Sequence, residues 1–226
     1  MVVAIQKTTL LDYPDTIASI LFFSGCNFRC PYCYNYELVL QTHTPLDIEG
    51  ALCELAARKK YIDGVVISGG EPTLNRKLRD LMSLIKEMGL LIKLDTNGSR
   101  PGVIQDLIEE SLVDYLAMDI KTDIDTYPAV TGVETDPRAI EDSIDIILHA
   151  GIDYEFRTTV VPVFHTRETF EAIGPLVRNA RKYFLQQFIP ERTLDPAFEH
   201  VRPYPREVLQ QFRAVLERYG CAVDIR

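Results

Sequence analysis

Residues 17–33 read IASILFFSGCNFRCPYC, an apolar run that leads directly into a loop with three cysteines. The run at 17–23 has the length and the β-branched and aromatic content of a buried strand. The loop places Cys26, Cys30 and Cys33 at a C-x3-C-x2-C spacing. Three cysteines within eight residues predict a metal site rather than a set of disulfide crosslinks.

Further apolar runs of strand length alternate with segments of helical period along the rest of the chain. This alternation is typical of a parallel sheet with crossover helices. The predicted strands are 17–23, 64–68, 91–95, 115–119, 154–161 and 184–189, and 221–225 is a candidate for a short edge strand. The predicted helices are 47–61, 75–88, 101–111, 137–150, 166–182 and 205–219, with N-caps at Asn75 and Thr166 and C-caps at Gly89, Gly151 and Gly220.

The number of strand–helix units decides the predicted architecture. Six units are fewer than the eight of a closed TIM barrel, and 226 residues are fewer than the ~250 typical of that barrel. We therefore expect an α/β fold, an open partial (β/α)6 TIM-like barrel, with residues 1–226 forming a single domain.

Charge and hydropathy narrow the classes of partner. The formal net charge of -9 disfavours nucleic acid, whose binding proteins usually display clustered Lys and Arg. The longest apolar runs fall well short of the ~20 residues of a membrane-spanning helix. The first residues lack the pattern of a secretion signal, so we expect no membrane association and a cytoplasmic location.

The three-cysteine loop suits an iron–sulfur cluster with one open iron. Three thiolates can ligate three irons of a four-iron cubane, whereas closed clusters use four Cys. Gly25 allows close approach to the cluster, and Pro31 restricts the loop between the second and third ligands. A structural zinc site is the alternative, but it requires four ligands and the chain has no second cysteine pair. Cys53 and Cys221 are predicted to be small buried hydrophobic residues.

Three motifs lie at the ends of the next predicted strands. They are Gly69-Gly70-Glu71-Pro72, Asp95-Thr96-Asn97-Gly98 and Asp119-Ile120-Lys121, and Arg157 belongs to the predicted strand 154–161. Because ligands bind at the carboxyl ends of parallel strands, we expect these residues and Cys26 to face one mouth. The histidines, His43, His149, His165 and His200, have no ligand spacing, and surface or capping roles are expected for them.

With these motifs the chain resembles the radical S-adenosylmethionine (SAM) superfamily, whose signature is C-x3-C-x2-C with an aromatic residue, here Tyr32, before the last Cys. The order of the strand-end motifs is similar to that of glycyl-radical-enzyme activases. Thr8-Thr9-Leu10-Leu11-Asp12-Tyr13-Pro14 resembles the N-terminus of the activases of anaerobic ribonucleoside-triphosphate reductase. Tyr34 stands where activases of pyruvate formate-lyase commonly have His, which favours the reductase type.

The resemblance implies a set of cofactor contacts. Cys26, Cys30 and Cys33 would hold a [4Fe-4S] cluster. The ammonium of SAM would donate to the carbonyls of Gly69 and Gly70 and to Glu71, while Lys121 and Arg157 are the candidate partners of its carboxylate. The remaining implied contacts are Tyr32 and Asn35 with SAM, and Asp95, Thr96 and Asp119 with a monovalent cation.

The resemblance also implies an activity. A flavodoxin-like or ferredoxin-like donor would reduce the cluster, and SAM cleavage would give a 5'-deoxyadenosyl radical. That radical would take a hydrogen from a glycine of a partner enzyme, with anaerobic ribonucleotide reductase as the expected partner. Two alternatives stay open. One is radical SAM chemistry on a small molecule or modified base, as in deazapurine carboxy-synthase-like enzymes. The other is a non-catalytic iron–sulfur binding or electron-transfer module.

Overall fold

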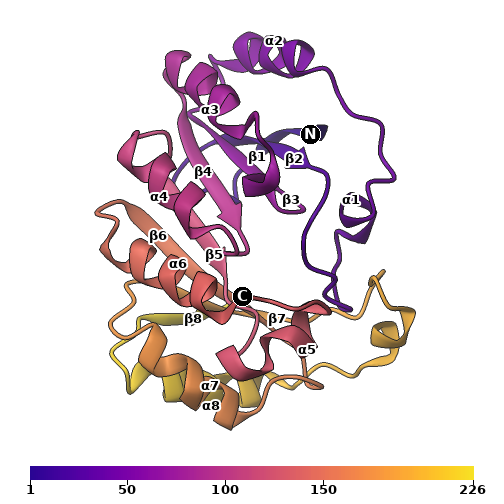
Figure 1. The fold of residues 1–226 in the computed structure, drawn as a ribbon, viewed down its shortest axis with the longest axis vertical. Coiled ribbons are helices and arrows are strands. Elements are labelled where there is room, and N and C mark those ends of the chain that lie inside the picture. Colours follow the sequence, from indigo (N-terminus) through magenta and orange to yellow (C-terminus); the bar gives the residue numbers. More distant parts are fainter. The chain divides into compact units, whose positions relative to one another are not determined.

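The computed structural model describes residues 1–226, with eight strands in one open sheet in the order β1 to β8 (Figure 1). The chain forms two compact units. The first comprises Met1–Asn27, Asn35–Thr96 and Gly102–Leu116, and the second Phe28–Tyr34, Asn97–Pro101 and Ala117–Arg226. The expected single-domain organisation stays a prediction.

The first unit is built on four strands: β1 (Val2–Thr9), β2 (Ala18–Phe23), β3 (Gly64–Gly69) and β4 (Leu91–Thr96). β1 runs antiparallel to β2, whereas β2, β3 and β4 are parallel. The register pairs Phe23 with Gly69 and Ile67 with Leu94. The last residues of β2, β3 and β4 therefore meet at the same edge. β5 (Tyr115–Asp119) begins in this unit and ends in the second.

Helices of the first unit pack on its strands, with α2 (Ile48–Arg58) against β1 and α3 (Leu78–Glu87) against β4. The unit also contains α1 (Tyr36–Val39), the 3-10 turn η1 (Pro72–Leu74) and α4 (Pro101–Glu109). In α3 the buried residues Leu78, Leu81, Met82 and Ile85 recur at helical spacing, and this stripe faces β4. Burial of such a stripe fixes how each helix lies on the sheet.

The second unit has three parallel strands, β6 (Asp153–Val160), β7 (Tyr183–Gln187) and β8 (Val223–Ile225). Its helices are α5 (Tyr127–Thr131), α6 (Pro137–His149), α7 (Arg167–Leu176) and α8 (Arg206–Glu217), with 3-10 turns η2 (Ile124–Thr126) and η3 (Pro196–His200). α7 and α8 lie side by side (Figure 1), with the rings of Phe170 and Phe212 stacked at 4.7 Å.

The predicted open partial barrel is confirmed, since each of the six expected strands is present in the order expected. The sequence analysis missed β1, an antiparallel strand whose exposed Gln6 and Lys7 interrupt the apolar pattern. The tail strand at 221–225 is present as β8.

Several predicted helix ends need correction. α3 begins after Lys77, because the Asn75 side chain accepts from the Lys77 N–H in a turn before the helix. The helix expected at 166–182 ends at Leu176, next to Pro175. Thr166 is the N-cap of α7, as expected, and it also forms a capping box with Thr169. Positive φ angles at the three predicted C-cap glycines, Gly89, Gly151 and Gly220, suit left-handed helix ends.

Two burial predictions were wrong. Cys53 is exposed, since it lies two residues from both Ala51 and Leu55, the buried positions of α2, and hence on the opposite side. His165 is fully buried rather than a surface residue. Cys221 is buried as expected, and its Sγ contacts the Val177 carbonyl.

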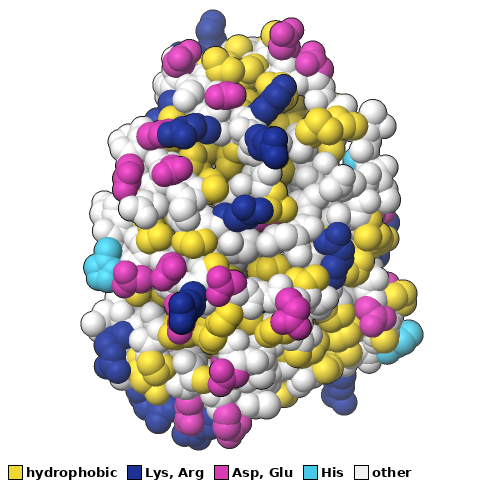
Figure 2. All heavy atoms as spheres, viewed as in Figure 1, with side chains coloured by type: hydrophobic (Ala, Val, Ile, Leu, Met, Phe, Trp, Pro, Cys, Tyr) yellow, Lys and Arg dark blue, Asp and Glu magenta, His cyan; other side chains and the backbone are white.

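The surface gives no sign of a large basic region on the face drawn in Figure 2. Lys and Arg side chains there are interspersed with acidic and apolar ones. No helix has the length and hydropathy needed to span a bilayer.

Candidate functional site

Cys30 and Cys33 lie on one tight turn of the second unit. The Cys33 N–H donates to the Cys30 carbonyl at 3.1 Å, with Pro31 at the second position of the turn. Proline suits that position because its fixed φ matches the turn. The second and third cysteines of the motif therefore lie at the two ends of one turn, while Cys26 belongs to the first unit. None of the three cysteines forms a disulfide.

Backbone hydrogen bonds fasten the cysteine loop to the second unit. The Arg29 N–H donates to the Thr131 carbonyl at 2.7 Å, and the Asp195 N–H donates to the Pro31 carbonyl at 2.9 Å. Gly132 has a φ of +69°, and an added Cβ would lie 2.7 Å from the Arg29 carbonyl oxygen. The loop is therefore held by main-chain contacts on both sides of Cys30.

Aromatic packing fixes the residues around Cys33. The buried Tyr32 ring packs against Phe164 and Phe188, and the Tyr34 ring stacks on Phe188 at 6.2 Å. The Ile189 N–H donates to the Tyr34 hydroxyl at 2.7 Å. Burial raises the pKa of Tyr32, so its phenol stays protonated. The Tyr32 hydroxyl is buried and has no hydrogen-bond partner within the protein.

The glycine pair after β3 packs directly on the backbone that precedes Cys26. The Gly70 N–H donates to the Phe23 carbonyl and the Glu71 N–H to the Gly25 carbonyl, both at 2.8 Å. A Cβ on Gly70 would lie 2.1 Å from the Gly25 carbonyl oxygen, and one on Gly69 would lie 2.4 Å from that of Phe23. No side chain fits there, so both positions require glycine.

Glu71 is buried behind this glycine pair. Its Oε1 atom accepts from the Thr73 N–H at 3.1 Å, from the Thr73 hydroxyl, and from the Thr96 hydroxyl at 2.9 Å. Only 2% of Glu71 is exposed. The Glu71 carboxylate therefore links the end of β3 to the end of β4.

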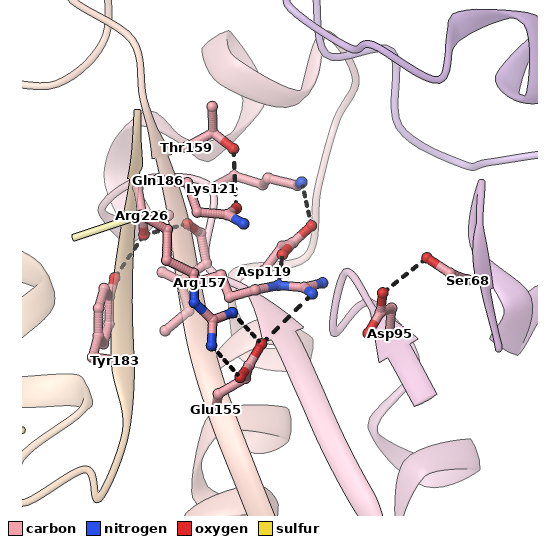
Figure 3. A network of polar contacts seen from close by, with 12 residues as sticks. Ser68, Asp95, Asp119, Lys121, Glu155, Arg157, Thr159, Tyr183, Gln186 and Arg226 are labelled. Carbon is pink, nitrogen blue, oxygen red and sulfur yellow. Dashed lines mark hydrogen bonds and ion pairs between the residues drawn. The ribbon is translucent and has the colours of Figure 1, made fainter. Parts of the chain in front are cut away.

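Asp95 lies beside this group at the end of β4. Its Oδ2 atom accepts from the Ser68 hydroxyl at 2.8 Å (Figure 3), and its Oδ1 atom accepts from the Lys93 ammonium. The sequence analysis expected Asp95 and Thr96 but missed Ser68 and Lys93. A lysine inside an otherwise apolar strand was the signal available for Lys93.

Asp119 binds two cations in the second unit (Figure 3). Its Oδ1 atom is 2.7 Å from Arg157 Nε, and its Oδ2 atom is 3.1 Å from Lys121 Nζ. Burial alone would raise the pKa of Asp119, but the two cations outweigh burial and lower it. Burial alone would lower the pKa of Lys121, but Asp119 outweighs it and raises the pKa well above the usual value. Both side chains stay ionised.

The ion network extends to two residues that the sequence analysis did not select. Glu155 is 1% exposed and lies 3.8 Å from Arg157 Nη1 and 3.3 Å from Arg226 Nη1 (Figure 3). The Arg226 guanidinium also covers the ring of Phe184. A glutamate within a buried strand was the signal for Glu155, but nothing local to the sequence indicated Arg226.

His165 is a further buried group next to Lys121. Its Nδ1 atom accepts from the Val161 N–H at 2.9 Å, and its Nε2 atom is 2.8 Å from the Lys121 carbonyl. Because a carbonyl only accepts, Nε2 carries the proton. Burial lowers the pKa of His165, which favours this neutral form.

The remaining predicted contact, Asn35, is exposed at the start of α1, and its side chain does not cap that helix. The first unit thus contains Cys26, Asn35, Gly69, Gly70, Glu71, Asp95 and Thr96, and the second contains Cys30, Tyr32, Cys33, Asp119, Lys121 and Arg157.

The donor chemistry fits an iron–sulfur cluster with SAM. Three cysteine ligands would leave one iron of a cubane open, and the main chain at Gly70 can be approached closely because no side chain occupies it. Neither unit by itself contains a group of three His, Cys, Asp or Glu side chains arranged for a metal ion. A monovalent cation at Asp95 fits less well, since both carboxylate oxygens already accept hydrogen bonds.

Known proteins share both the sequence and the fold. The profile of the Radical SAM superfamily matches residues 20–180. A protein from Methanocaldococcus jannaschii that carries the name glycyl-radical enzyme activating enzyme is 33% identical over all of this chain and 95% of its own length. The pyruvate formate-lyase-activating enzyme of Clostridium pasteurianum is 30% identical over 84% of this chain and 82% of its own length.

A solved structure agrees on the fold. Streptococcus suis SuiB bound to S-adenosylmethionine superposes with a TM-score of 0.68 at 14% identity, over 92% of this chain and 51% of SuiB. Enzymes of this superfamily use a [4Fe-4S] cluster and SAM, the pair of cofactors that three cysteines and a glycine-lined strand end suit. This chain is an enzyme of the radical SAM superfamily and belongs to the family of the glycyl-radical enzyme activating enzymes.

Proposed function

We propose that this enzyme generates a glycyl radical on a partner enzyme, and that the partner is an anaerobic ribonucleotide reductase. The observation that carries the proposal is the similarity of the whole chain to a protein named as a glycyl-radical enzyme activating enzyme. The choice of partner is supported by the segment Thr8–Pro14, which resembles the N-terminus of the activases of that reductase. This segment forms an ordered turn, in which the Thr9 hydroxyl donates to Asp12 and accepts from the Leu11 N–H, while Tyr13 is buried.

We further propose which residues hold the cofactors. Cys26, Cys30 and Cys33 would ligate the cluster. When bound and reduced, the cluster supplies the electron that cleaves SAM to methionine and a 5'-deoxyadenosyl radical. A flavodoxin-like or ferredoxin-like protein would supply that electron, and the enzyme would act in the cytoplasm.

Two charged groups of the protein suit the ammonium and the carboxylate of the methionine part of SAM. In the first unit, Glu71 and the carbonyls of Gly69 and Gly70 would accept from the SAM ammonium. In the second unit, the network of Asp119, Lys121, Glu155, Arg157 and Arg226 contains three cations and two anions. Its one net positive charge favours a carboxylate, and Lys121 and Arg157 would bind it. Tyr32 and Asn35 would contact the rest of SAM.

Electron paramagnetic resonance tests the proposal. Cluster-loaded protein, SAM, a strong reductant and a candidate reductase are mixed without oxygen. A protein-based glycyl radical should form, and it should be absent when the target glycine of the reductase is replaced by alanine. Formation of 5'-deoxyadenosine without any radical on the reductase would reject this partner.

The same assay separates the two alternatives. SAM cleavage that is stimulated by a purine-like small molecule, and not by any glycyl radical enzyme, would favour small-molecule chemistry. A sample that retains iron yet never cleaves SAM under a strong reductant would favour a non-catalytic module. The Cys30→Ala variant serves as the control that lacks a proposed cluster ligand.

A further inference from the structure

Lys93 is a buried cation in the middle of β4. Only 1% of the residue is exposed, and its neighbours in the strand, Ile92 and Leu94, are fully buried. An ammonium group taken out of water is strongly destabilising unless it is paired. The structure must therefore contain a partner that compensates its charge.

Asp95 is that partner. Residues two apart in a strand point to the same face, so Lys93 and Asp95 share one face of β4. Lys93 Nζ lies 2.5 Å from Asp95 Oδ1, and the Tyr115 ring lies 5.9 Å from the same nitrogen. The Lys93 side chain is 2% exposed and that of Asp95 16%, so water does little to weaken the pair.

The neighbouring oxygens also have protein donors. Ser68 donates to the second oxygen of Asp95, and the Thr96 hydroxyl donates to Glu71. Of the three charged side chains in this group, Lys93 and Asp95 cancel, and Glu71 leaves one net negative charge. This one negative charge matches the single ammonium of SAM. A metal cation bound here as well would leave Lys93, Asp95 and Glu71 with no net charge to attract that ammonium.

We propose that Lys93 is a positioning residue whose ammonium is the built-in counter-ion of Asp95, in place of a monovalent metal cation. Because the ammonium is part of the Lys93 side chain, it cannot dissociate from the protein. The end of β4 should therefore keep its geometry whichever cation is present in solution. Only the expected effect of Lys93 on SAM affinity rests on the proposed SAM contacts. The role of Lys93 does not depend on which partner receives the radical.

Cation dependence tests the proposal in the cluster-loaded protein. SAM affinity and the thermal midpoint without SAM are measured in potassium chloride and in choline chloride at equal ionic strength. In the unaltered protein, both should be insensitive to potassium, with affinity changing by less than about two-fold. A clear gain of affinity or stability with potassium would overturn the proposal, and this arm needs no variant.

In the Lys93→Met variant, SAM affinity and the thermal midpoint should become dependent on potassium. In choline chloride the variant should lose SAM affinity by about ten-fold or more, because the partly buried Asp95 carboxylate loses its cation. Potassium or ammonium should restore part of the affinity and raise the thermal midpoint. A variant whose affinity and midpoint ignore these cations would also overturn the proposal.

Two further variants separate the possible failures. Lys86→Met removes a lysine of the same unit whose partner is the partly exposed Asp114, and it should show no cation dependence. The double variant Lys93→Met with Asp95→Asn removes both charges and should lose the potassium effect on the midpoint. In the Lys93→Met variant, a potassium effect on the thermal midpoint without any effect on SAM affinity would uphold the counter-ion role of Lys93 and reject the proposed SAM contacts.

Discussion

Arg157 bridges two carboxylates of different strands, with its Nε atom 2.7 Å from Asp119 on β5 and its Nη1 atom 3.8 Å from Glu155 on its own strand β6. A planar guanidinium spreads its N–H donors over three nitrogens and can reach two separated acceptors, whereas a lysine ammonium carries all its donors on one atom. The Arg157 side chain is 13% exposed, so its two ion pairs are only weakly screened by water.

We predict that Arg157→Met weakens SAM binding by about ten-fold and lowers the free energy of unfolding by about 2 kcal/mol. The loss is moderate because Asp119 keeps Lys121 and Glu155 keeps Arg226. Calorimetric titration with SAM and denaturant unfolding measure the two effects. Arg213→Met, which removes an exposed pair with Glu217, should change neither. An Arg157→Lys variant that behaves as the unaltered protein would contradict the bridging role.

Cys30→Ala should abolish both cluster retention and SAM cleavage, because only two of the four irons of the cluster would keep a cysteine ligand. Iron analysis after anaerobic reconstitution and chromatography of 5'-deoxyadenosine measure the two losses. Cys53→Ala is the matched control, since Cys53 is exposed on α2 and lies outside the loop. Full cleavage activity in Cys30→Ala would disprove the ligand assignment.

Gly70→Ala should lower the free energy of unfolding by about 2 kcal/mol or more, because the new methyl group would overlap the Gly25 carbonyl oxygen. The backbone would have to move next to Cys26, so SAM affinity should fall as well. Gly102→Ala is the control, since nothing lies within 4 Å of its added Cβ in α4. Equal stabilities of the two variants, measured by denaturant unfolding, would refute the close packing of this turn.

His165 should make the protein less stable in mild acid. Folding favours the neutral ring because burial lowers the pKa of His165 and outweighs the hydrogen bonds to the Lys121 and Val161 main chain and the charge of Asp123, which act to raise it. Stability is therefore fully present above the ordinary histidine pKa of about 6.5 and falls as the pH drops below it, by at most about 1.4 kcal/mol per pH unit.

Unfolding free energies between about pH 7.5 and 5.5 test this titration, because histidine is the side chain that ordinarily titrates in that interval. His165→Gln should flatten the dependence on pH, whereas His149→Gln, at an exposed position of α6, should leave it as it is. An unaltered slope in His165→Gln would assign the acid sensitivity to other groups.

Much of the candidate site could be predicted because its signals are local. The cysteine spacing, the glycine pair after β3 and the polar residues after β4 and β5 follow apolar strands, and parallel strands present their ends at one edge. The exposed position of Cys53 was also readable, since it lies half a turn away from Ala51 and Leu55 in α2. The antiparallel strand β1 was missed because its polar residues hide the strand pattern.

The sequence by itself determined the cysteine spacing of the loop and the order of strands and helices, because each depends on neighbouring residues. Tertiary structure alone decided which charges meet. The hydrogen bond of Ser68 to Asp95 and the ion pair of Arg226 with Glu155 depend on strand register and on segments far apart in the chain. The physical reason is that a buried charge must find its partner wherever folding brings one.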